Sequence, residues 1–357
     1  MIFNRFRKYK PVENHCKSGC KCLFNRYNND MKRARPELAQ SETIDELPLA
    51  CSDEKSAIEF FERKRWGDTP CCPSCGDINV YQMKDRKTGE RNKDFRWRCR
   101  GCGKLYSVRL GMIMEESLLP MTVWARAIWE ASVSKNGCSA LELSRKTQIS
   151  YKSALFVLNR LRFAMKMDTD PPKLTGTIEA DELYWGGKAR HPRIVRGQAR
   201  PGPNPDKPKT PIFAVVQRGG GVRASVMPSV TAGNVREKML ALADPSCRLM
   251  TDELKAYRRI GKPFAQHDTV NHTRREYVNK SDPSIHTNCV ESFFARVRRG
   301  LTGTHHAVSP EHLHRYVTQY EWLYNARQMN DGERVEHLIR NADGKRLAYK
   351  ESSKRAG

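Results

Sequence analysis

The chain has 357 residues and a formal net charge of +24, from 64 Lys plus Arg against 40 Asp plus Glu. This length is enough for two or three domains with at least one sizeable core. A charge excess of this size concentrates polyanions, so nucleic acid is the expected partner, with a ribosomal or membrane-surface protein as the alternative.

Hydropathy and cysteine usage exclude two further classes of protein. No segment approaches the roughly 18 unbroken apolar residues that a membrane-spanning helix needs, and the basic start Met1–Arg7 lacks the apolar core of a signal peptide. We therefore expect no membrane association and a cytoplasmic location, associated with the nucleoid. With twelve cysteines in a reducing compartment, metal ligation is favoured over a disulfide framework.

Residues 1–54 are expected to form a poorly ordered leader, because charges, Asn and Pro dominate and no apolar period persists. Met31 is an alternative start of translation, because nothing upstream of it reads as folded. Four residues offer a second metal site, although their spacing fits no common template and an unstructured leader is the alternative. They are His15, Cys16, Cys20 and Cys22.

Residues 55–115 are expected to form a zinc ribbon, because they contain two CxxC pairs that are each followed by a glycine. Two thiolates at this spacing grip one face of a tetrahedral zinc ion, and the second pair closes the site. Gly76 and Gly103 permit the positive φ of a tight knuckle. Cys71, next to the first pair, is the alternative ligand there. No coordination position stays open, so the zinc is expected to be structural. Its ligands are Cys72, Cys75, Cys99 and Cys102.

Residues 116–170 are expected to be helical and to bind DNA. Apolar residues recur at three- and four-residue steps on both sides of Ser139–Ser150, which reads as a short helix and a turn. Ser150 suits the N-cap of the helix that follows. Because the polar side of that helix is basic, the segment is typical of a helix-turn-helix, with a plain helical linker as the alternative. This polar side consists of Lys152, Asn159, Arg160 and Arg162.

Beyond Pro171 and Pro172 the pattern predicts an α/β domain over residues 171–335, followed by a basic tail over 336–357. The expected order is three strands, a helix and a strand. These elements are Thr177–Tyr184, Ile212–Gln217, Val222–Met227, Asn234–Ala243 and Arg248–Met250. The insert at residues 188–210 is rich in Lys, Arg and Pro, so we expect a flexible basic arm over DNA, with an incidental solvated loop as the alternative.

Three acidic residues occupy positions that neither a core nor a DNA-facing surface would favour. Asp181 lies in a strand that should be mostly buried, Asp252 follows another short strand, and Glu291 lies within His286–Gly300. Carboxylates at the ends of neighbouring strands and on a flanking helix can hold two Mg²⁺ (or Mn²⁺) ions. Bound cations would also reverse the repulsion between these residues and DNA phosphates.

The segment around Glu291 is predicted to be an amphipathic helix. At about 100° per residue, its large apolar side chains gather on one side. The opposite side presents a polar stripe, for which an ordinary solvated face is the alternative. The apolar side consists of Val290, Phe293, Phe294, Val297 and Leu301, and the stripe of Asn288, Glu291, Ala295 and Arg298.

Together these motifs resemble the transposases of the insertion-sequence 1595 family, over about residues 55–330. The resemblance rests on Asp181-Glu-Leu-Tyr-Trp-Gly-Gly-Lys188, on Thr251-Asp252-Glu253 and on the run from His286-Thr-Asn-x-x-Glu291 to Tyr324-Asn325-x-Arg327. It implies a ribonuclease-H-like catalytic domain that cleaves double-stranded DNA at the ends of a mobile element and transfers the strands to a target. Since two ends must be cut and joined in concert, we expect a homodimer or higher oligomer on DNA.

The resemblance also bears on individual residues. In this family the third catalytic position is Asn or Glu, which Asn288 and Glu291 both match, while Arg298 stands where Lys is usual. Glu291 is preferred as the metal ligand because it is anionic, and Asn288 and Arg298 are expected to position the substrate. His305 occupies a position where an aromatic residue is commoner.

Two other functions fit parts of the sequence. A non-enzymatic DNA-binding regulator would keep the cysteines and the helix-turn-helix but have no use for the three carboxylates. A nuclease of the same fold would need the same metals, and only the resemblance argues against it. Several histidines offer another metal site or a general base, although hydrogen bonding or phosphate contact is preferred because Mg²⁺ favours oxygen. They are His267, His272, His286, His305 and His306.

Overall fold

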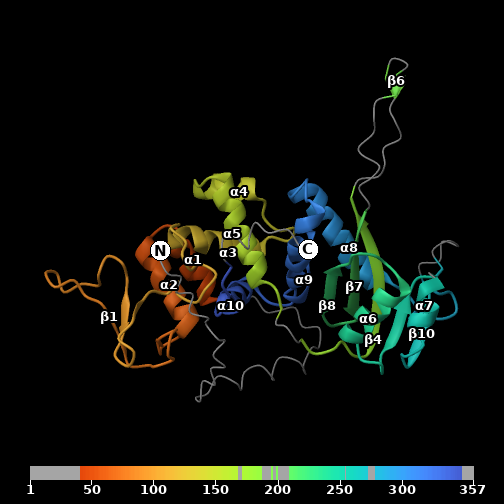
Figure 1. Cartoon of the computed structure of the whole chain (residues 1–357), viewed down its shortest axis with the longest axis horizontal. Helices are drawn as coiled ribbons and strands as arrows, with labels where there is room; N and C mark the ends of the chain where they lie inside the picture. The colour runs from red at the N-terminus through yellow and green to blue at the C-terminus, as the bar shows by residue number, and fades with distance from the viewer. Residues whose placement is uncertain are drawn as a thin grey trace, which may run out of the picture.

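The structure is a computed structural model, which describes residues 41–167, 171–186, 194–195, 198–199, 209–253, 255–271 and 278–347. The candidate metal site at His15–Cys22 lies outside these residues, as do Met31, His272 and the chain beyond residue 347. Figure 1 shows three parts: a small ribbon near β1, a central group of helices, and a twisted sheet with covering helices. No helix in the described part of the chain is long and apolar enough to cross a membrane.

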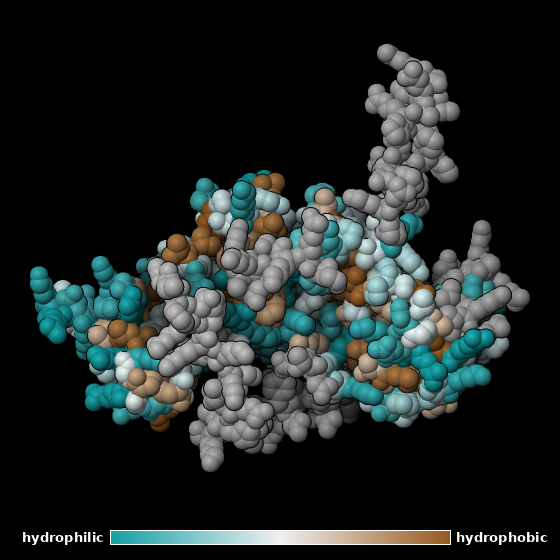
Figure 2. All heavy atoms as spheres, in the orientation of Figure 1, coloured by the Kyte–Doolittle hydropathy of each residue, from teal (hydrophilic) through white to brown (hydrophobic). Residues whose placement is uncertain are grey.

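The ribbon is a three-stranded antiparallel sheet in the order β1-β2-β3. Its strands are β1 (Val80–Gln82), β2 (Trp97–Cys99) and β3 (Leu105–Tyr106). Only a few apolar side chains are buried here, and Trp66 packs edge-on against Trp97 and Tyr106. Figure 2 shows a mainly hydrophilic surface at the tip of this part. So small a core needs an additional tie to stay folded.

Helices from both ends of the chain form the central group. They are α1 (Glu42–Ala50), α2 (Glu54–Trp66), α3 (Met121–Val133), α4 (Ala140–Thr147), α5 (Tyr151–Ala164) and α10 (Asp331–Ala342). Helix α10 starts with a capping box between Asn330 and Glu333. It packs against α1, α2, α3 and α5.

This packing corrects two expected boundaries. Residues 42–54 are largely helical rather than a poorly ordered leader, and residues 336–342 belong to α10 rather than to a basic tail. Helix α1 is short and contains Pro48, so it has little local signal. Its buried Leu47 finds its partners in helices far away in the sequence, which a periodicity argument cannot detect.

Helices α4 and α5 take the predicted places, joined by a turn in which Gln148 has a left-handed φ of 56°. The Ser150 side chain accepts a hydrogen bond from the Ser153 amide, which confirms it as the N-cap of α5. The prediction that Arg160 and Arg162 lie on an exposed polar side was wrong, because they are only 3% and 2% exposed.

Both arginines are structural. Arg160 donates to the carbonyls of Ile113 and Glu115, and Arg162 donates to Gln319 Oε1 on α9. A long side chain can bury its stem and still satisfy its guanidinium on backbone oxygens, so residue type alone does not identify the exposed side of a helix.

The large sheet has five strands in the order β10-β9-β4-β7-β8. They are β4 (Thr177–Trp185), β7 (Thr210–Gln217), β8 (Val222–Val226), β9 (Arg248–Thr251) and β10 (Gln266–Thr269). Strands β4, β7 and β8 are antiparallel neighbours, whereas β9 runs parallel to both β4 and β10. The four strands expected from the sequence are confirmed within one or two residues, and β10 was not predicted.

Helices cover both faces of this sheet. One face packs against α6 (Ala232–Leu242) and α7 (Lys255–Ile260), and the other against α8 (Asn288–Arg299) and α9 (Pro310–Asn325). A π-helical turn at Gly300–Thr304 follows α8. In the basic insert, Ile194–Val195 (β5) and Gln198–Ala199 (β6) pair as a short hairpin, which Figure 1 places away from the sheet. The rest of the insert up to residue 208 lies outside the described residues, so the expected arm over DNA stays a prediction.

Candidate active site and metal centre

The four cysteines of the two CxxC pairs come together in the ribbon. Their Sγ atoms all lie within 4.8 Å of one another. Those of Cys72 and Cys102 are 3.7 Å apart, and those of Cys75 and Cys99 are 3.6 Å apart. A tetrahedral zinc ion with bonds of about 2.3 Å needs sulfur atoms roughly 3.8 Å apart. The arrangement therefore fits zinc, and Cys71 is not part of the cluster.

Backbone groups around the cysteines favour the thiolate form. Gly76 and Gly103 have φ of 76° and 70°, the positive values that were expected for the two knuckles. The amide of Cys102 donates to Cys99 Sγ at 3.4 Å. Against a backbone hydrogen bond from Asp77, burial and the neighbouring thiols raise the pKa of the Cys75 thiol to about 12, whereas a hydrogen bond from the backbone of Lys104 lowers the pKa of the Cys102 thiol to about 7. Such amides stabilise the anionic sulfur that binds zinc.

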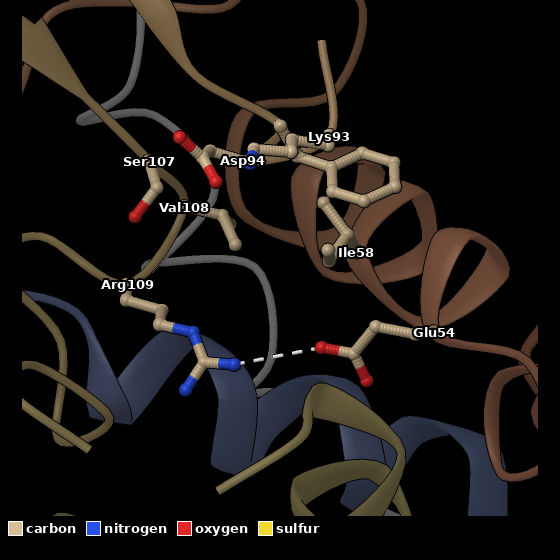
Figure 3. A pocket seen from close by; sticks show the side chains of 8 residues that line it. Glu54, Ile58, Lys93, Asp94, Ser107, Val108 and Arg109 are labelled. Carbon is tan, nitrogen blue, oxygen red and sulfur yellow. Dashed lines mark ion pairs between the residues drawn. The ribbon is translucent and has the colours of Figure 1, made fainter. Parts of the chain in front are cut away.

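A pocket of about 220 Å³ lies where the ribbon meets α2 (Figure 3). Glu54 and Arg109 form an ion pair of 3.5 Å beside it. The Glu54 carboxylate also accepts the amides of Met121 and Thr122, at 2.8 and 3.2 Å, and so caps α3. None of the predicted catalytic residues lines this pocket, and the Glu54 carboxylate is already engaged in joining α2, α3 and the ribbon.

Asp181 lies on β4, and Asp252 directly follows the neighbouring parallel strand β9. In the pairing of β4 with β9, Glu179 is opposite Met250. Continuing this register by two residues sets Asp181 beside Asp252, which directly follows the last residue of β9. Both carboxylates are partly exposed. This register therefore sets Asp181, in the middle of β4, level with Asp252 just beyond the end of β9.

Side chains of β4 alternate between the two faces of the sheet, which separates Asp181 from its acidic neighbour Glu182. Leu183 packs with the core beneath α8 and α9, so Asp181 is directed to that face. Glu182 is directed to the other face and accepts a hydrogen bond of 2.5 Å from the hydroxyl of Tyr257 on α7.

The Glu182 carboxyl is close enough to Asp181 and Asp252 for their charges to affect its pKa. Burial, opposed by the hydrogen bond from Tyr257 and supported by the charges of Asp181 and Asp252, raises the pKa of the Glu182 carboxyl to about 7. Three acidic groups therefore influence one another at this end of the sheet. Oxygen-only groups of this kind suit Mg²⁺ or Mn²⁺, and bound cations would offset their repulsion.

Helix α8 has the predicted amphipathic character. Val290, Phe293, Phe294 and Val297 are buried, whereas Asn288 and Arg298 are exposed and Glu291 is partly exposed. Glu291 lies in the first turn and accepts a hydrogen bond of 2.9 Å from the Thr287 hydroxyl. The helix covers the same face of the sheet to which Asp181 is directed.

The carboxylates of Asp181, Asp252 and Glu291 do not form a closed cluster. Among the described residues, two groups have three or more ligand atoms within 4.8 Å, and neither contains Asp181, Asp252 or Glu291. One group is the zinc site. In the other, Glu130, Cys138 and Glu142, Lys146 bridges the two carboxylates at 2.9 and 2.8 Å, which explains their proximity without a metal.

Two parts of the chain match known protein families. Residues 52–105 match the transposase zinc-ribbon domain, and residues 173–325 match the ISXO2-like transposase domain of the insertion-sequence 1595 family. The chain belongs to the insertion-sequence 1595 family of transposases. It is a DNA transposase with a zinc-ribbon domain and a mixed α/β transposase domain.

Two further similarities accompany the family match. An uncharacterised protein in the transposable element ISH50 of Halobacterium salinarum is 28% identical over 279 residues, which cover 75% of this chain and 90% of that protein. The crystal structure of the Mos1 strand transfer complex aligns at 15% identity, over 58% of this chain and 75% of that chain, with a TM-score of 0.21. A TM-score this low establishes no common fold.

Two charged residues that the sequence interpretation passed over, Glu179 and Arg218, form an ion pair two residues along β4 from Asp181. Glu179 is fully buried in β4 and accepts hydrogen bonds from Arg218, at 2.6 Å, and from the first amides of α8. The signal was present, because Glu179 precedes Asp181 by two residues and so lies on the same face of the strand. Buried charges of this kind are rare unless they are paired.

Three of the candidate histidines contact neighbouring side chains. His267 Nε2 lies 2.9 Å from the Thr251 hydroxyl, and His286 Nδ1 lies 3.1 Å from Arg218 Nη2. His305 packs against Tyr316 with ring centroids 4.7 Å apart, which explains how it replaces an aromatic residue. Burial lowers the pKa of His305 to about 3, so it is neutral at physiological pH.

Proposed function

We propose that the transposase cuts and joins DNA with divalent metal ions, Mg²⁺ or Mn²⁺, held by Asp181, Asp252 and Glu291. Supporting this is the alignment of the two aspartates on adjacent strands, on the face that α8 covers. We further propose that the transposase domain is ribonuclease-H-like. Its antiparallel β4-β7-β8 unit, flanked on the side of β4 by two parallel strands, supports that assignment.

In the proposed reaction, a water oxygen attacks a phosphodiester at the end of the element. The bond from phosphorus to the leaving oxygen breaks and releases a 3′-hydroxyl, which then attacks a target phosphodiester and displaces its 3′ oxygen. Bound cations would lower the pKa of the attacking hydroxyl and stabilise the leaving oxygen. Asn288 and Arg298, exposed on the stripe of α8, would contact the flanking phosphates.

We propose that α4 and α5 form the helix-turn-helix and bind the element ends in the cytoplasm, at the nucleoid. With Arg160 and Arg162 buried, the N-terminal end of α5 offers the contacts. Tyr151 is 53% exposed there, and Lys152 is exposed beside it. In such motifs the first residues of the second helix reach the base edges.

The third metal ligand can be assigned with two variants of α8. Glu291→Ala should abolish Mg²⁺-dependent cleavage of DNA that carries the element end, because it removes an anionic ligand. Asn288→Ala should retain cleavage within roughly tenfold, the scale of about 1.4 kcal/mol for one outer polar contact. Ser292→Ala, an exposed neighbour, serves as the control. Near-normal cleavage by Glu291→Ala beside an inactive Asn288→Ala would assign the ligand to Asn288 instead.

We also propose that at least two chains act together, since two element ends must be cut and joined in concert. Size measurement on DNA that contains the ends should give a protein mass of at least two chains of 41.0 kDa. A strictly monomeric complex that still carries out transposition would rule this out.

A further inference from the structure

We propose that Glu179 is a positioning residue, which fixes the start of α8 relative to Asp181 and thereby sets the affinity of the carboxylate site for divalent metal. The inference rests on the proposed function, because it gives the first turn of α8 a part in the metal site. Its basis is the contact of Glu179 on β4 with the first turn of α8.

Both oxygens of Glu179 are fully used. Arg218 Nε donates to Oε1 at 2.6 Å, and the amides of Cys289 and Val290 donate to Oε2 at 2.7 and 3.1 Å. The side chain is 0% exposed. A metal ion would have to displace a guanidinium and two amides to reach this carboxylate. Glu179 therefore acts through other residues rather than as a ligand.

The first turn of α8 depends on Glu179 for its cap. The first amides of any helix have no partner within the helix, and a negative charge at this end is favoured. The N-cap residue Thr287 makes no capping bond with its own side chain, and its hydroxyl donates to Glu291 Oε1. The side chain that would ordinarily cap the helix thus orients Glu291, and β4 supplies the cap.

Arg218 ties a third segment to the same point. It directly follows β7 and donates through Nη1 to the Ser284 carbonyl at 2.6 Å and through Nη2 to the His286 carbonyl at 2.8 Å. The guanidinium therefore fixes the segment that leads into α8, while its Nε holds Glu179. The contacts of Glu179 and Arg218 thus join β4, the segment that leads into α8 and the start of α8. They do so two residues along β4 from Asp181.

A glutamine at position 179 keeps the shape of the side chain but cannot keep this arrangement. It has one acceptor oxygen, and its amide group would meet a donor from either Arg218 or the start of α8. We expect the first turn of α8 to shift and Glu291 to shift with it. Substitution of a residue that orients metal ligands typically lowers metal affinity or activity by about 10- to 100-fold.

The test measures Mn²⁺ binding by electron paramagnetic resonance on the zinc-loaded full chain, together with cleavage of end-containing DNA as a function of Mn²⁺ concentration. Glu179→Gln should weaken binding by about 10- to 100-fold and raise the half-saturating Mn²⁺ concentration equally. At saturating Mn²⁺ the rate should return to within a few-fold of the wild type, because every ligand is still present. Loss of folded protein would instead lower the rate at every concentration.

Glu54→Gln is the matched control, since Glu54 caps α3 in the same way and pairs with Arg109 far from the carboxylates. It should leave Mn²⁺ binding unchanged. If Glu179→Gln does not fold, Arg218→Lys decides, because it keeps the charge but cannot span Glu179 and two carbonyls. If a folded Glu179→Gln or Arg218→Lys variant binds Mn²⁺ with wild-type affinity, the inference is overturned. Wild-type affinity in Asp181→Asn would overturn the proposed function instead.

Discussion

Replacing Asp181 or Asp252 with Asn should abolish DNA cleavage by this transposase. The loss should be at least about 10³-fold, because removing a single preorganised contact to transition-state charge already costs roughly 10²–10³ in rate. The register of β4 with β9, continued by two residues, sets Asp181 level with Asp252, so each change removes one charge from the same proposed metal site. The measurement is Mg²⁺-dependent cleavage of end-containing DNA by purified protein.

DNA binding by the same variants should persist or become tighter. Each substitution removes a negative charge that repels phosphates, in a protein whose net charge of +24 already attracts them. Retained binding also shows that the protein is folded. The combination of full binding and no cleavage separates loss of chemistry from loss of structure.

Glu182→Gln is the control for this experiment. Glu182 adjoins Asp181 in sequence, but its side chain lies on the opposite face of the sheet and contacts Tyr257. We expect cleavage within about tenfold of the wild type, the equivalent of roughly 1.4 kcal/mol. Full activity in Asp252→Asn would refute the catalytic assignment. An inactive Glu182→Gln would show that cleavage also needs the acidic side chain on the opposite face of the sheet.

Serine at Cys75 or Cys102 should unfold the ribbon. The ribbon buries few apolar side chains, and a structural zinc site of this kind contributes about 10 kcal/mol or more of apparent binding free energy to folding. The variants should lose zinc and bind DNA ends weakly, while the large sheet and its helices stay folded. Zinc content by mass spectrometry and circular dichroism of the remaining fold would measure both effects.

Cys71→Ser is the matched control, because Cys71 adjoins Cys72 but lies outside the cluster. It should retain one zinc ion per chain and normal binding of DNA ends. A wild-type protein that contains no zinc would refute the metal assignment. Loss of zinc in Cys71→Ser would instead show that Cys71 is a ligand.

By itself the sequence determined the features that depend on local pattern. The CxxC spacing predicted the zinc site, because two thiolates three residues apart can reach one ion whatever surrounds them. The period of α8 predicted which residues are buried, from Val290 to Val297, because a helix repeats every 3.6 residues. Alternating and apolar runs predicted four of the five strands of the large sheet for the same reason.

Only the tertiary structure decided the features that join distant segments. Helices α1 and α10 are stable because they pack on each other and on α3, although they lie at opposite ends of the chain. Arg160 is buried because backbone carbonyls of another segment accept its guanidinium. Glu179 holds α8 in place because Arg218 and two amides converge on it. Local periodicity carries no information about such partners, since burying a charge is favourable only once the fold has brought its partners together.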